Sequence, residues 1–308
     1  MEDIYRLFRQ VFPYIRREEQ TLRDIMSDER YERIERRNDS GELIAVSMIS
    51  APTILLLMVR EDYRGLGIGS QLLRQSEGII KQQGHGKVVL GLGKDYLMPG
   101  VPTSKRYFEA EHENLYPFLN SEASTFFEKR HYHHAWKDAN CFDMRMSLAD
   151  FHDEGCQVGD TIDDILYRWA DRSDLESIVA CVDDAEKEFT GYYLTESLYN
   201  GQRPQQVLVA DNGSEIVGTL IVSVETEGKD MGSVGCTTVR HDHRGRHIGV
   251  NMVKTGTRYL KDIGLSEACL NYTYSGLDHM YGYAGYQICT YYMMGEKDIS
   301  QNVYSSCS

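Results

Sequence analysis

The sequence lacks several features that would place a protein in a class at once. Its 308 residues contain no apolar run of 18 or more, so no transmembrane helix is expected. The first twenty residues are charged throughout and lack the apolar centre of a secretory signal peptide. The seven cysteines form no Cys-x-x-Cys pair, which argues against a disulfide framework or a zinc site. Scattered cysteines of this kind favour reduced thiols and a cytoplasmic location.

Basic residues are also fewer than acidic residues. Lysine and arginine number 33 against 47 aspartates and glutamates, a net charge of −14. Such a surface repels nucleic acid backbones and anionic membranes, so neither is expected as a partner. It attracts cations, and a substrate with a protonated amine would be one. The histidines of residues 131–134 (HYHH) have no matching acidic or cysteine partner in the sequence. A strand with surface histidines is therefore expected there, and no metal site.

The chain does contain one long repeat. Residues 59–73 (VREDYRGLGIGSQLL) and 239–253 (VRHDHRGRHIGVNMV) are related by an offset of 180. Seven of the fifteen positions are identical, namely Val59/Val239, Arg60/Arg240, Asp62/Asp242, Arg64/Arg244, Gly65/Gly245, Ile68/Ile248 and Gly69/Gly249. Solenoid repeats have far shorter periods, so this offset indicates a duplicated domain. We expect domains at residues 1–148 and 162–308, with a polar connection between them, and a chain of this length accommodates both.

Each copy of the repeat predicts a strand, a glycine-rich turn and a helix. The apolar run Thr53–Val59 predicts a buried strand. After the turn, apolar residues fall near one face of a helix that stops at Gly84, namely Ile68, Leu72, Leu73, Ile79 and Ile80. The helix therefore begins within residues 64–69, where its first N–H groups have no intrahelical partner and carry the positive end of the helix dipole. Glycines in that turn would let a pyrophosphate approach the backbone closely.

Three kinds of glycine-rich phosphate loop compete for this pattern. A Walker A loop needs Gly-Lys-Ser/Thr, but Ser70 follows Gly69 directly. A Rossmann turn needs Gly-x-Gly-x-x-Gly and an acidic residue about 20 positions further on. The spacing here is Gly-x-Gly-x-Gly, and residues 87–89 (KVV) occupy the region where that acid is expected. The third kind, Arg-x-x-Gly-x-Gly/Ala after a strand, fits without these conflicts.

This third pattern resembles the coenzyme A loop of the GNAT superfamily of N-acetyltransferases. The resemblance extends to a Leu-Tyr-x-x-x-Gly-Phe motif in a later short helix, which residues 280–286 (MYGYAGY) match. In the first half, residues 126–132 (FFEKRHY) stand in the corresponding place. The resemblance covers most of both halves. It implies an α/β (α+β) fold with two GNAT-like domains, each a mixed, mostly antiparallel sheet flanked by helices.

The resemblance also implies a function and a set of site residues. The expected activity is transfer of an acetyl group from acetyl-CoA to the amine of a small molecule. The residues expected to bind the cofactor are Val59, Arg64, Gly65, Gly67, Ile68 and Gly69, with Val239, Arg244, Gly245, His247, Ile248 and Gly249 in the second copy. The family uses a tyrosine on the later helix to protonate the departing sulfur, and Tyr281 holds that position.

The two halves depart from the family pattern at different points. The first half has Phe127 where the second has Tyr281, and a phenylalanine cannot give a proton. The second half has His247 where the first has Gly67. An imidazole there either crowds a pyrophosphate or, when protonated, pairs with it. The loss of the proton donor is the greater damage to the chemistry, so the second half is expected to be catalytic and the first to bind cofactor or serve as a scaffold.

The general base and the acceptor are less well defined by the sequence. Glu225 and Glu227 lie near the end of a strand close to the expected acceptor site, and Asn271 lies on the strand after the loop helix. A chain of water molecules is a further alternative. Residues 93–120 form an insertion that is absent from the second half, and they line the acceptor pocket or pack the two halves together. The oligomeric state is left open by the sequence.

Two other functions stay open at this point. Both halves are imperfect, so the protein could bind acyl-CoA without turnover and act as a regulator. Some tandem proteins of this type use aminoacyl-tRNA as donor, but the acidic balance and the absence of a basic stripe argue against it.

Overall fold

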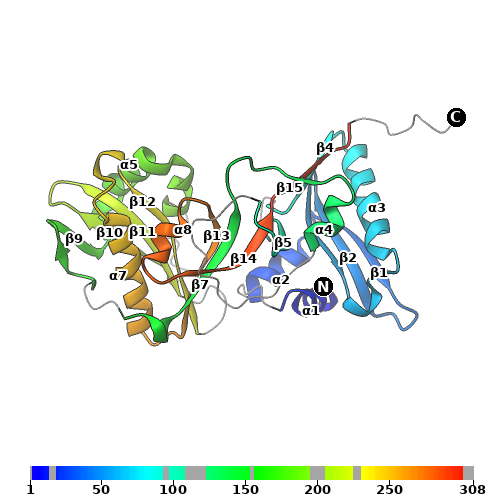
Figure 1. Cartoon of the computed structure of the whole chain (residues 1–308), viewed down its shortest axis with the longest axis horizontal. Coiled ribbons are helices and arrows are strands. Elements are labelled where there is room, and N and C mark those ends of the chain that lie inside the picture. The colour runs from blue at the N-terminus through cyan, green and yellow to red at the C-terminus, as the bar shows by residue number, and fades with distance from the viewer. Residues whose placement is uncertain are drawn as a thin grey trace. The chain divides into compact units, whose positions relative to one another are not determined.

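The computed structural model divides the chain into two compact units (Figure 1). It describes residues 2–13, 19–92, 97–107, 123–152, 156–194, 205–224 and 230–300. Unit 1 comprises Met1–Ala110, Phe118–Cys141 and Thr290–Ser308, and unit 2 comprises Glu111–Pro117 and Phe142–Cys289. Among the helices of these described ranges, none is both long enough and apolar enough to cross a bilayer.

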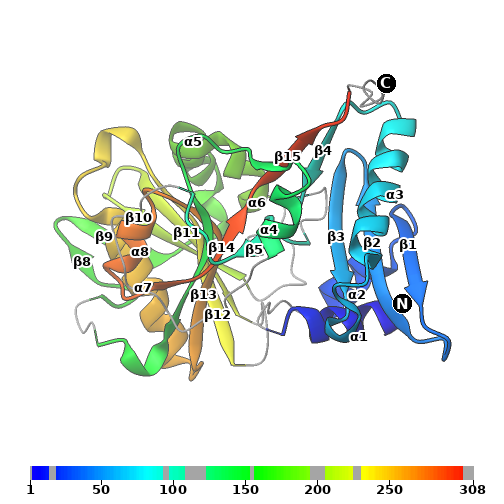
Figure 2. The same ribbon diagram turned by 45° about the vertical axis from the view of Figure 1, so that its right-hand side comes forward.

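Unit 1 is built on a sheet with the strand order β1-β2-β3-β4-β15-β6. Its strands are β1 (Glu32–Arg37), β2 (Leu43–Ser50), β3 (Thr53–Val59), β4 (Lys87–Leu90), β6 (His133–His134) and β15 (Gly295–Asp298). Neighbouring strands are antiparallel except β3 and β4, which are parallel. The helices are α1 (Glu2–Val11), α2 (Glu19–Ser27), α3 (Ile68–Gln82) and α4 (Ala123–Glu128), and Figure 2 shows α3 running along the sheet. Strand β3 matches the range predicted from the sequence.

Unit 2 repeats this plan with longer strands. Its sheet runs in the order β14-β7-β13-β12-β11-β10-β9-β8, and the parallel pair is β12 with β13. The strands are β7 (Cys141–Ser147), β8 (Thr161–Ile162), β9 (Ile165–Trp169), β10 (Gln205–Asp211), β11 (Ile216–Val224), β12 (Met231–Val239), β13 (Glu267–Tyr274) and β14 (Gln287–Met293). The helices are α5 (Leu175–Glu186), α6 (Thr190–Tyr192), α7 (Ile248–Asp262) and α8 (Asp278–Gly282). The predicted fold class, mixed sheets that are mostly antiparallel and flanked by helices, is confirmed.

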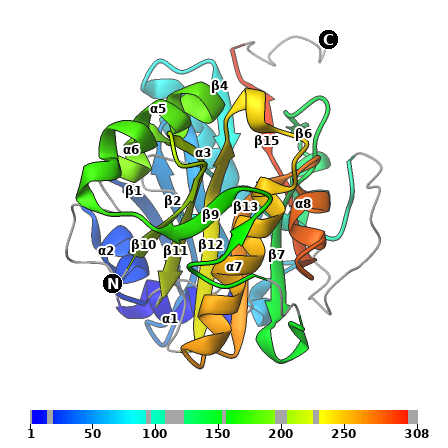
Figure 3. The same cartoon turned by 90° about the vertical axis from the view of Figure 1, so that its left-hand side faces the viewer.

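Helices α5 and α7 cover opposite faces of the sheet of unit 2 (Figure 3). A side chain added at Gly256 of α7 would meet Leu220 and Val222 of β11. Ile221, between them in the strand, packs with the buried residues of α5 instead. This alternation is what a strand buried on both faces requires.

The N-terminal cap of α5 differs from the sequence-based expectation. In the sequence, Ser173 with Glu176 three residues on has the spacing of a capping box, which predicts an N-cap at Ser173. The structure places the cap at Asp171, whose carboxylate accepts from the Ser173 N–H at 2.7 Å. The Asp174 carboxylate accepts in return from the Asp171 N–H at 2.8 Å, which completes a capping box around a short 3₁₀ turn. The expectation was wrong because the 3₁₀ turn adds residues before the α-helix begins.

The chain exchanges segments between the two units. Strand β7 comes from the first half of the sequence, but Phe142 onward belongs to unit 2. From Thr290 onward the chain belongs to unit 1, where the last residues of β14 pair with β5 (Val101–Thr103). Strand β15 then lies between β4 and β6. The compact units thus cross the domain boundary expected between residues 148 and 162, which stays a prediction for the family domains.

Strand β15 contributes ion pairs as well as backbone pairing to unit 1. Lys297 Nζ lies 2.9 Å from Glu77 Oε1 of α3, and Lys87 Nζ of β4 lies 2.7 Å from Glu296 Oε2. The Glu77–Lys297 pair is mostly shielded from solvent, since both side chains are about one-fifth exposed. Interactions of this kind tie the last strand to the helix that follows the first glycine-rich turn.

A truncation tests how far unit 1 depends on this last strand. A chain ending at Met294 loses β15 and is expected to unfold unit 1 at lower temperature, because β4 and β6 are left as unpaired edges. A chain ending at Ser300 keeps every contact named above and is the matched control. Hydrogen exchange followed by mass spectrometry measures protection separately in the two units. Equal protection of β4 in the two truncated chains would contradict the role assigned to β15.

Candidate active site

The two glycine-rich turns have the same backbone conformation. Four pairs of residues related by the offset of 180 share a positive φ, namely Gly65/Gly245 (78° and 79°), Gly67/His247 (81° and 58°), Gly84/Gly264 (86° and 89°) and Leu92/Tyr272 (56° and 58°). The first two pairs lie in the turns, and Gly84 and Gly264 lie just after the helices that follow. Leu92 lies just beyond β4, and Tyr272 lies near the end of β13. The repeat seen in the sequence is therefore a repeat of structure.

Each turn presents a run of backbone N–H groups at the start of a helix. The first helical hydrogen bond runs from the Gln71 N–H to the Gly67 carbonyl at 3.1 Å, and from the Asn251 N–H to the His247 carbonyl at 2.9 Å. The preceding amides thus carry the positive end of the helix dipole. A Cβ added at Gly65, Gly67 or Gly245 would meet no atom within 4 Å, so there is open space for a ligand at both turns. This geometry fits a pyrophosphate.

The repeated arginine has a structural task in each turn. Arg64 Nε donates to the Val59 carbonyl at 3.2 Å, and Arg244 Nε donates to the Val239 carbonyl at 3.1 Å. Both bonds close the turn back onto the last residue of the strand. Both arginines remain exposed, so their charge stays beside the helix start.

The last glycine of each loop lies beside the motif helix of its unit. A Cβ at Gly249 would lie 2.8 Å from Met280 Sδ of α8, and a Cβ at Gly69 would lie 3.5 Å from the Phe126 ring of α4. Gly249 thus lets α8 pack closely against the start of α7, whereas the 3.5 Å distance at Gly69 is ordinary van der Waals contact. The cofactor-binding role expected of both glycines stays a prediction.

The backbone bonds that end α4 and α8 identify the counterparts on these helices. The Tyr132 N–H donates to the Phe127 carbonyl at 3.2 Å, and the Tyr286 N–H donates to the Tyr281 carbonyl at 3.2 Å. Phe127 and Tyr281 are therefore structural equivalents. Their offset is 154, which is 26 less than 180 because of the insertion in the first half.

Tyr281 is buried beside the strand that enters the second loop. Its side chain is 5% exposed, and its Oη lies 3.2 Å from Thr237 Oγ1 of β12. Burial raises the pKa of Tyr281 to about 12, while the hydrogen bond to Thr237 opposes the shift. The phenol is thus protonated at neutral pH and able to donate.

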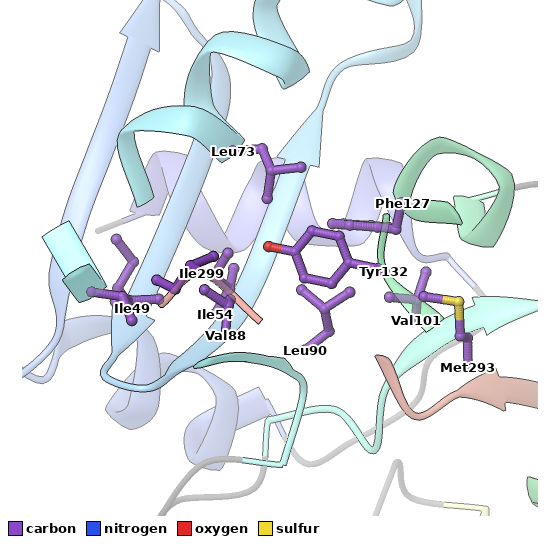
Figure 4. Close-up of a cluster of buried hydrophobic side chains, with 11 residues drawn as sticks. Ile49, Ile54, Leu73, Val88, Leu90, Val101, Phe127, Tyr132, Met293 and Ile299 are labelled. Atoms are coloured by element: carbon purple, nitrogen blue, oxygen red, sulfur yellow. The ribbon is translucent and has the colours of Figure 1, made fainter. Parts of the chain in front are cut away.

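In unit 1 the equivalent position offers no proton. Phe127 is 7% exposed and packs edge-on against Tyr132, with 5.6 Å between ring centres (Figure 4). It also lines a cavity of about 60 Å³ next to β3 and β4, together with apolar residues such as Ile54, Leu90 and Val101. The cavity has space for a group of a few atoms, but Phe127 cannot protonate it.

The described residues include only one of the three side chains considered for the general base. Glu225 and Glu227 lie outside the described residues. Asn271 lies on β13 and is exposed. A cavity of about 110 Å³ lies beside α8, between Met144, Ile288 and Tyr286, with Asp278 and His279 on its wall. The described residues therefore leave the base as a prediction.

Sequence reasoning missed two residues that the structure places near Tyr281. Thr237 contacts its hydroxyl, and the phenol of Tyr193 donates to the Cys236 carbonyl at 2.5 Å. Tyr193 lies at the end of α6, and no spacing pattern in the sequence singles it out. Its role depends on an irregularity in β12 that has no signature in the sequence.

Comparisons with known proteins support one family. The model of the acetyltransferase (GNAT) family matches residues 1–98 and 164–281. No curated protein matches the sequence significantly. A GCN5-related N-acetyltransferase from Sphaerobacter thermophilus superposes with a TM-score of 0.67 at 18% identity, covering 98% of this chain and 93% of its own. A tandem GNAT protein of the clavulanic acid biosynthesis pathway gives 0.65 at 13% identity, covering 98% and 95%.

A third structure is much longer than this chain. The GCN5-related glucosamine N-acetyltransferase region of a fungal multi-domain β-N-acetylglucosaminidase gives a TM-score of 0.70 at 18% identity over 96% of this chain. This chain spans 36% of that protein. At these identities the likeness is one of fold.

A reciprocal exchange between the turns tests the equivalence of Gly67 and His247. His247 has a left-handed conformation that costs a non-glycine residue about 1–2 kcal/mol. Gly67→His should lower the free energy of unfolding by about that much, without a clash, because the Cβ position is open. His247→Gly should raise it by less than about 1 kcal/mol, since glycine also gains entropy in the unfolded chain. Urea unfolding measures both, and an unchanged stability of Gly67→His would contradict the equivalence.

Proposed function

The chain belongs to the acetyltransferase (GNAT) family, and we propose that its unit 2 transfers an acetyl group from acetyl-CoA to the amine of a small molecule. The observation that carries this proposal is the buried, protonated phenol of Tyr281. It lies beside Thr237 of β12, the strand that leads into the second turn. A proton donor, an anion-binding helix start and a strand end occur together in one unit.

The binding of acetyl-CoA is assigned to the turns. In unit 2 the amides of residues 245–250 and the charge of Arg244 would hold its pyrophosphate beside His247, in the way a helix start holds an anion. The bound molecule supplies the acetyl group as a thioester. Holding donor and acceptor together contributes up to about 7–11 kcal/mol to lowering the barrier, so binding geometry carries much of the rate.

Tyr281 is assigned the role of general acid. The amine nitrogen of the acceptor forms a bond to the carbonyl carbon, the carbon–sulfur bond breaks, and the Tyr281 hydroxyl gives its proton to the sulfur. The proton lost by the amine leaves through a base or water, for which Glu225, Glu227 and Asn271 remain the candidates. Positioned proton transfer of this kind contributes about 10²–10⁴-fold to the rate.

Unit 1 is assigned a binding role without catalysis. It has the same turn and an apolar cavity, but Phe127 replaces the acid. This observation also favours the alternative that the whole protein binds acyl-CoA without turnover. Tight binding with no transfer to any amine would support that alternative over the transferase.

The acceptor is proposed to be a small amine in the cytoplasm. The net charge of −14 favours a cationic acceptor and disfavours a tRNA donor. None of the cysteines that the structure describes forms a disulfide bond, in keeping with a reducing compartment. A filter-binding measurement with tRNA at moderate salt separates the aminoacyl-tRNA alternative from this one.

Calorimetric titration with acetyl-CoA is the first test. Binding is expected with a Kd in the micromolar range, the usual scale for enzyme substrates, on the order of 1 μM to 1 mM. An assay of thiol release over a panel of small amines should then show turnover above the rate of acetyl-CoA hydrolysis. The absence of binding at high micromolar acetyl-CoA would rule the transferase out.

The removal of one hydroxyl tests the acid. Tyr281→Phe should lower kcat by about 10²–10⁴-fold and change the Kd of acetyl-CoA by less than about twofold, because the hydroxyl acts on the departing sulfur. Tyr286→Phe is the matched control, since it also removes a buried hydroxyl, one that lies 3.0 Å from Thr257 Oγ1. Loss of turnover in Phe127→Ala with normal turnover in Tyr281→Phe would reverse the assignment of the two units.

A further inference from the structure

Strand β12 contains a bulge immediately before Thr237. Its partners in β11 are Thr219 opposite Thr238 and Ile221 opposite Gly235, so β12 has one residue more than β11 between these pairs. Cys236 lies within this stretch and has φ of +50°. A left-handed, non-glycine residue in a strand costs about 1–3 kcal/mol and persists only where the surroundings hold it.

The bulge changes which face of the sheet each following residue occupies. Val234 lies on the face of α7, because a Cβ at Gly256 would be 3.0 Å from its side chain. In a regular strand Cys236 would share that face. Instead Cys236 packs with the buried residues of α5, and Thr238 on the same face lies 4.0 Å from Cys181. Thr237 is thereby turned toward α8 and Tyr281.

Tyr193 holds the bulge from the face of α5. Its side chain is wholly buried, with 0% exposure, and its Oη donates to the Cys236 carbonyl at 2.5 Å. Burial raises the pKa of Tyr193 well above its ordinary value, so the phenol remains a donor at every pH of interest. The bond ties the Tyr193 side chain to the backbone of the bulge, and removal of one partner of a buried hydrogen bond costs about 1–3 kcal/mol.

We propose that Tyr193 is a positioning residue for acetyl transfer, whose hydroxyl fixes the β12 bulge and so keeps Thr237 against the hydroxyl of Tyr281. Tyr193 acts through the Cys236 carbonyl and touches neither reacting group. The proposal rests on the function proposed for unit 2. It also links the segment after α6, which precedes β10 in the sequence, to the orientation of the proposed acid.

The comparison with unit 1 supports a functional role for the left-handed residue in the β12 bulge. Strand β3 also has a bulge, because Met48 faces Leu56 while Ile49 faces Ile54. Leu56, the counterpart of Cys236 at the offset of 180, is not among the described residues with positive φ. The left-handed bulge residue thus occurs in the unit with Tyr281, and its counterpart in the unit with Phe127 lacks that conformation.

The substitution Tyr193→Phe removes the hydroxyl and keeps the ring. We expect kcat to fall about 10- to 100-fold, because a small displacement of a reacting group is costly, while KM for acetyl-CoA changes less than about twofold. Tyr167→Phe is the control. Tyr167 is a buried tyrosine of the same unit, and its Oη accepts from Asn251 Nδ2 at 3.2 Å. A kcat of Tyr193→Phe equal to that of the control would overturn the proposal.

A double-substitution cycle separates positioning from general loss of packing. If Tyr193 acts through Tyr281, then Tyr193→Phe should reduce kcat much less in the Tyr281→Phe background than in the wild type. Equal reductions in both backgrounds would show that Tyr193 stabilises the fold alone, and would overturn the proposal.

Hydrogen exchange gives a readout that does not need turnover. In Tyr193→Phe the peptide covering residues 231–239 should exchange at least about tenfold faster, as expected for the loss of one buried hydrogen bond, while peptides of β10 keep their wild-type rates. Unchanged exchange in residues 231–239 would refute the positioning role even if the wild type is an active transferase. Faster exchange in an inactive wild type would instead count against the transferase alone.

Discussion

The structure depends on a left-handed turn that converts a buried strand into a helix. At Gly65 and Gly67, and again at Gly245 and His247, the backbone takes a conformation that L-residues avoid. This turn aims the first amides of α3 and α7 outward from the end of the strand. The strand, the helix and the amides at the helix start are therefore set by one local constraint, and the rest of each unit is packed around it.

The motif helix is attached to this turn by steric fit. Gly249 leaves room for Met280, and Gly69 lies beside the Phe126 ring, so α8 and α4 lie against the starts of the preceding helices. The residue next along each helix is then directed into the unit, as Tyr281 in one and Phe127 in the other. A duplicated frame thus places one side chain in the same way twice, and the chemistry of a unit changes with that single side chain.

Much of the fold was predictable because its signals are local. The apolar run of β3, the glycines of the turn and the stop at Gly84 act within a few residues. The exchange of β7 and β15 between the units was not predictable, because the sequence of a strand of four to seven residues does not indicate which sheet it joins. In the site, Tyr281 was found from its motif, whereas Thr237 and Tyr193 were missed because a bulge is set by pairing across strands.

The two units differ at a position in the exposed turn and at a position in the core, and a substitution has a different free-energy cost at each. His247 retains the backbone of Gly67 at the expense of local strain, and its side chain is exposed. Position 127 lies in the core, where phenylalanine removes a hydroxyl that would otherwise need a buried partner. Where no proton donor is needed, as proposed for unit 1, burial favours the apolar ring. In unit 2, by contrast, the buried phenol of Tyr281 has Thr237 as its hydrogen-bond partner. The bulge of β12 beside Thr237 contains the strained residue Cys236.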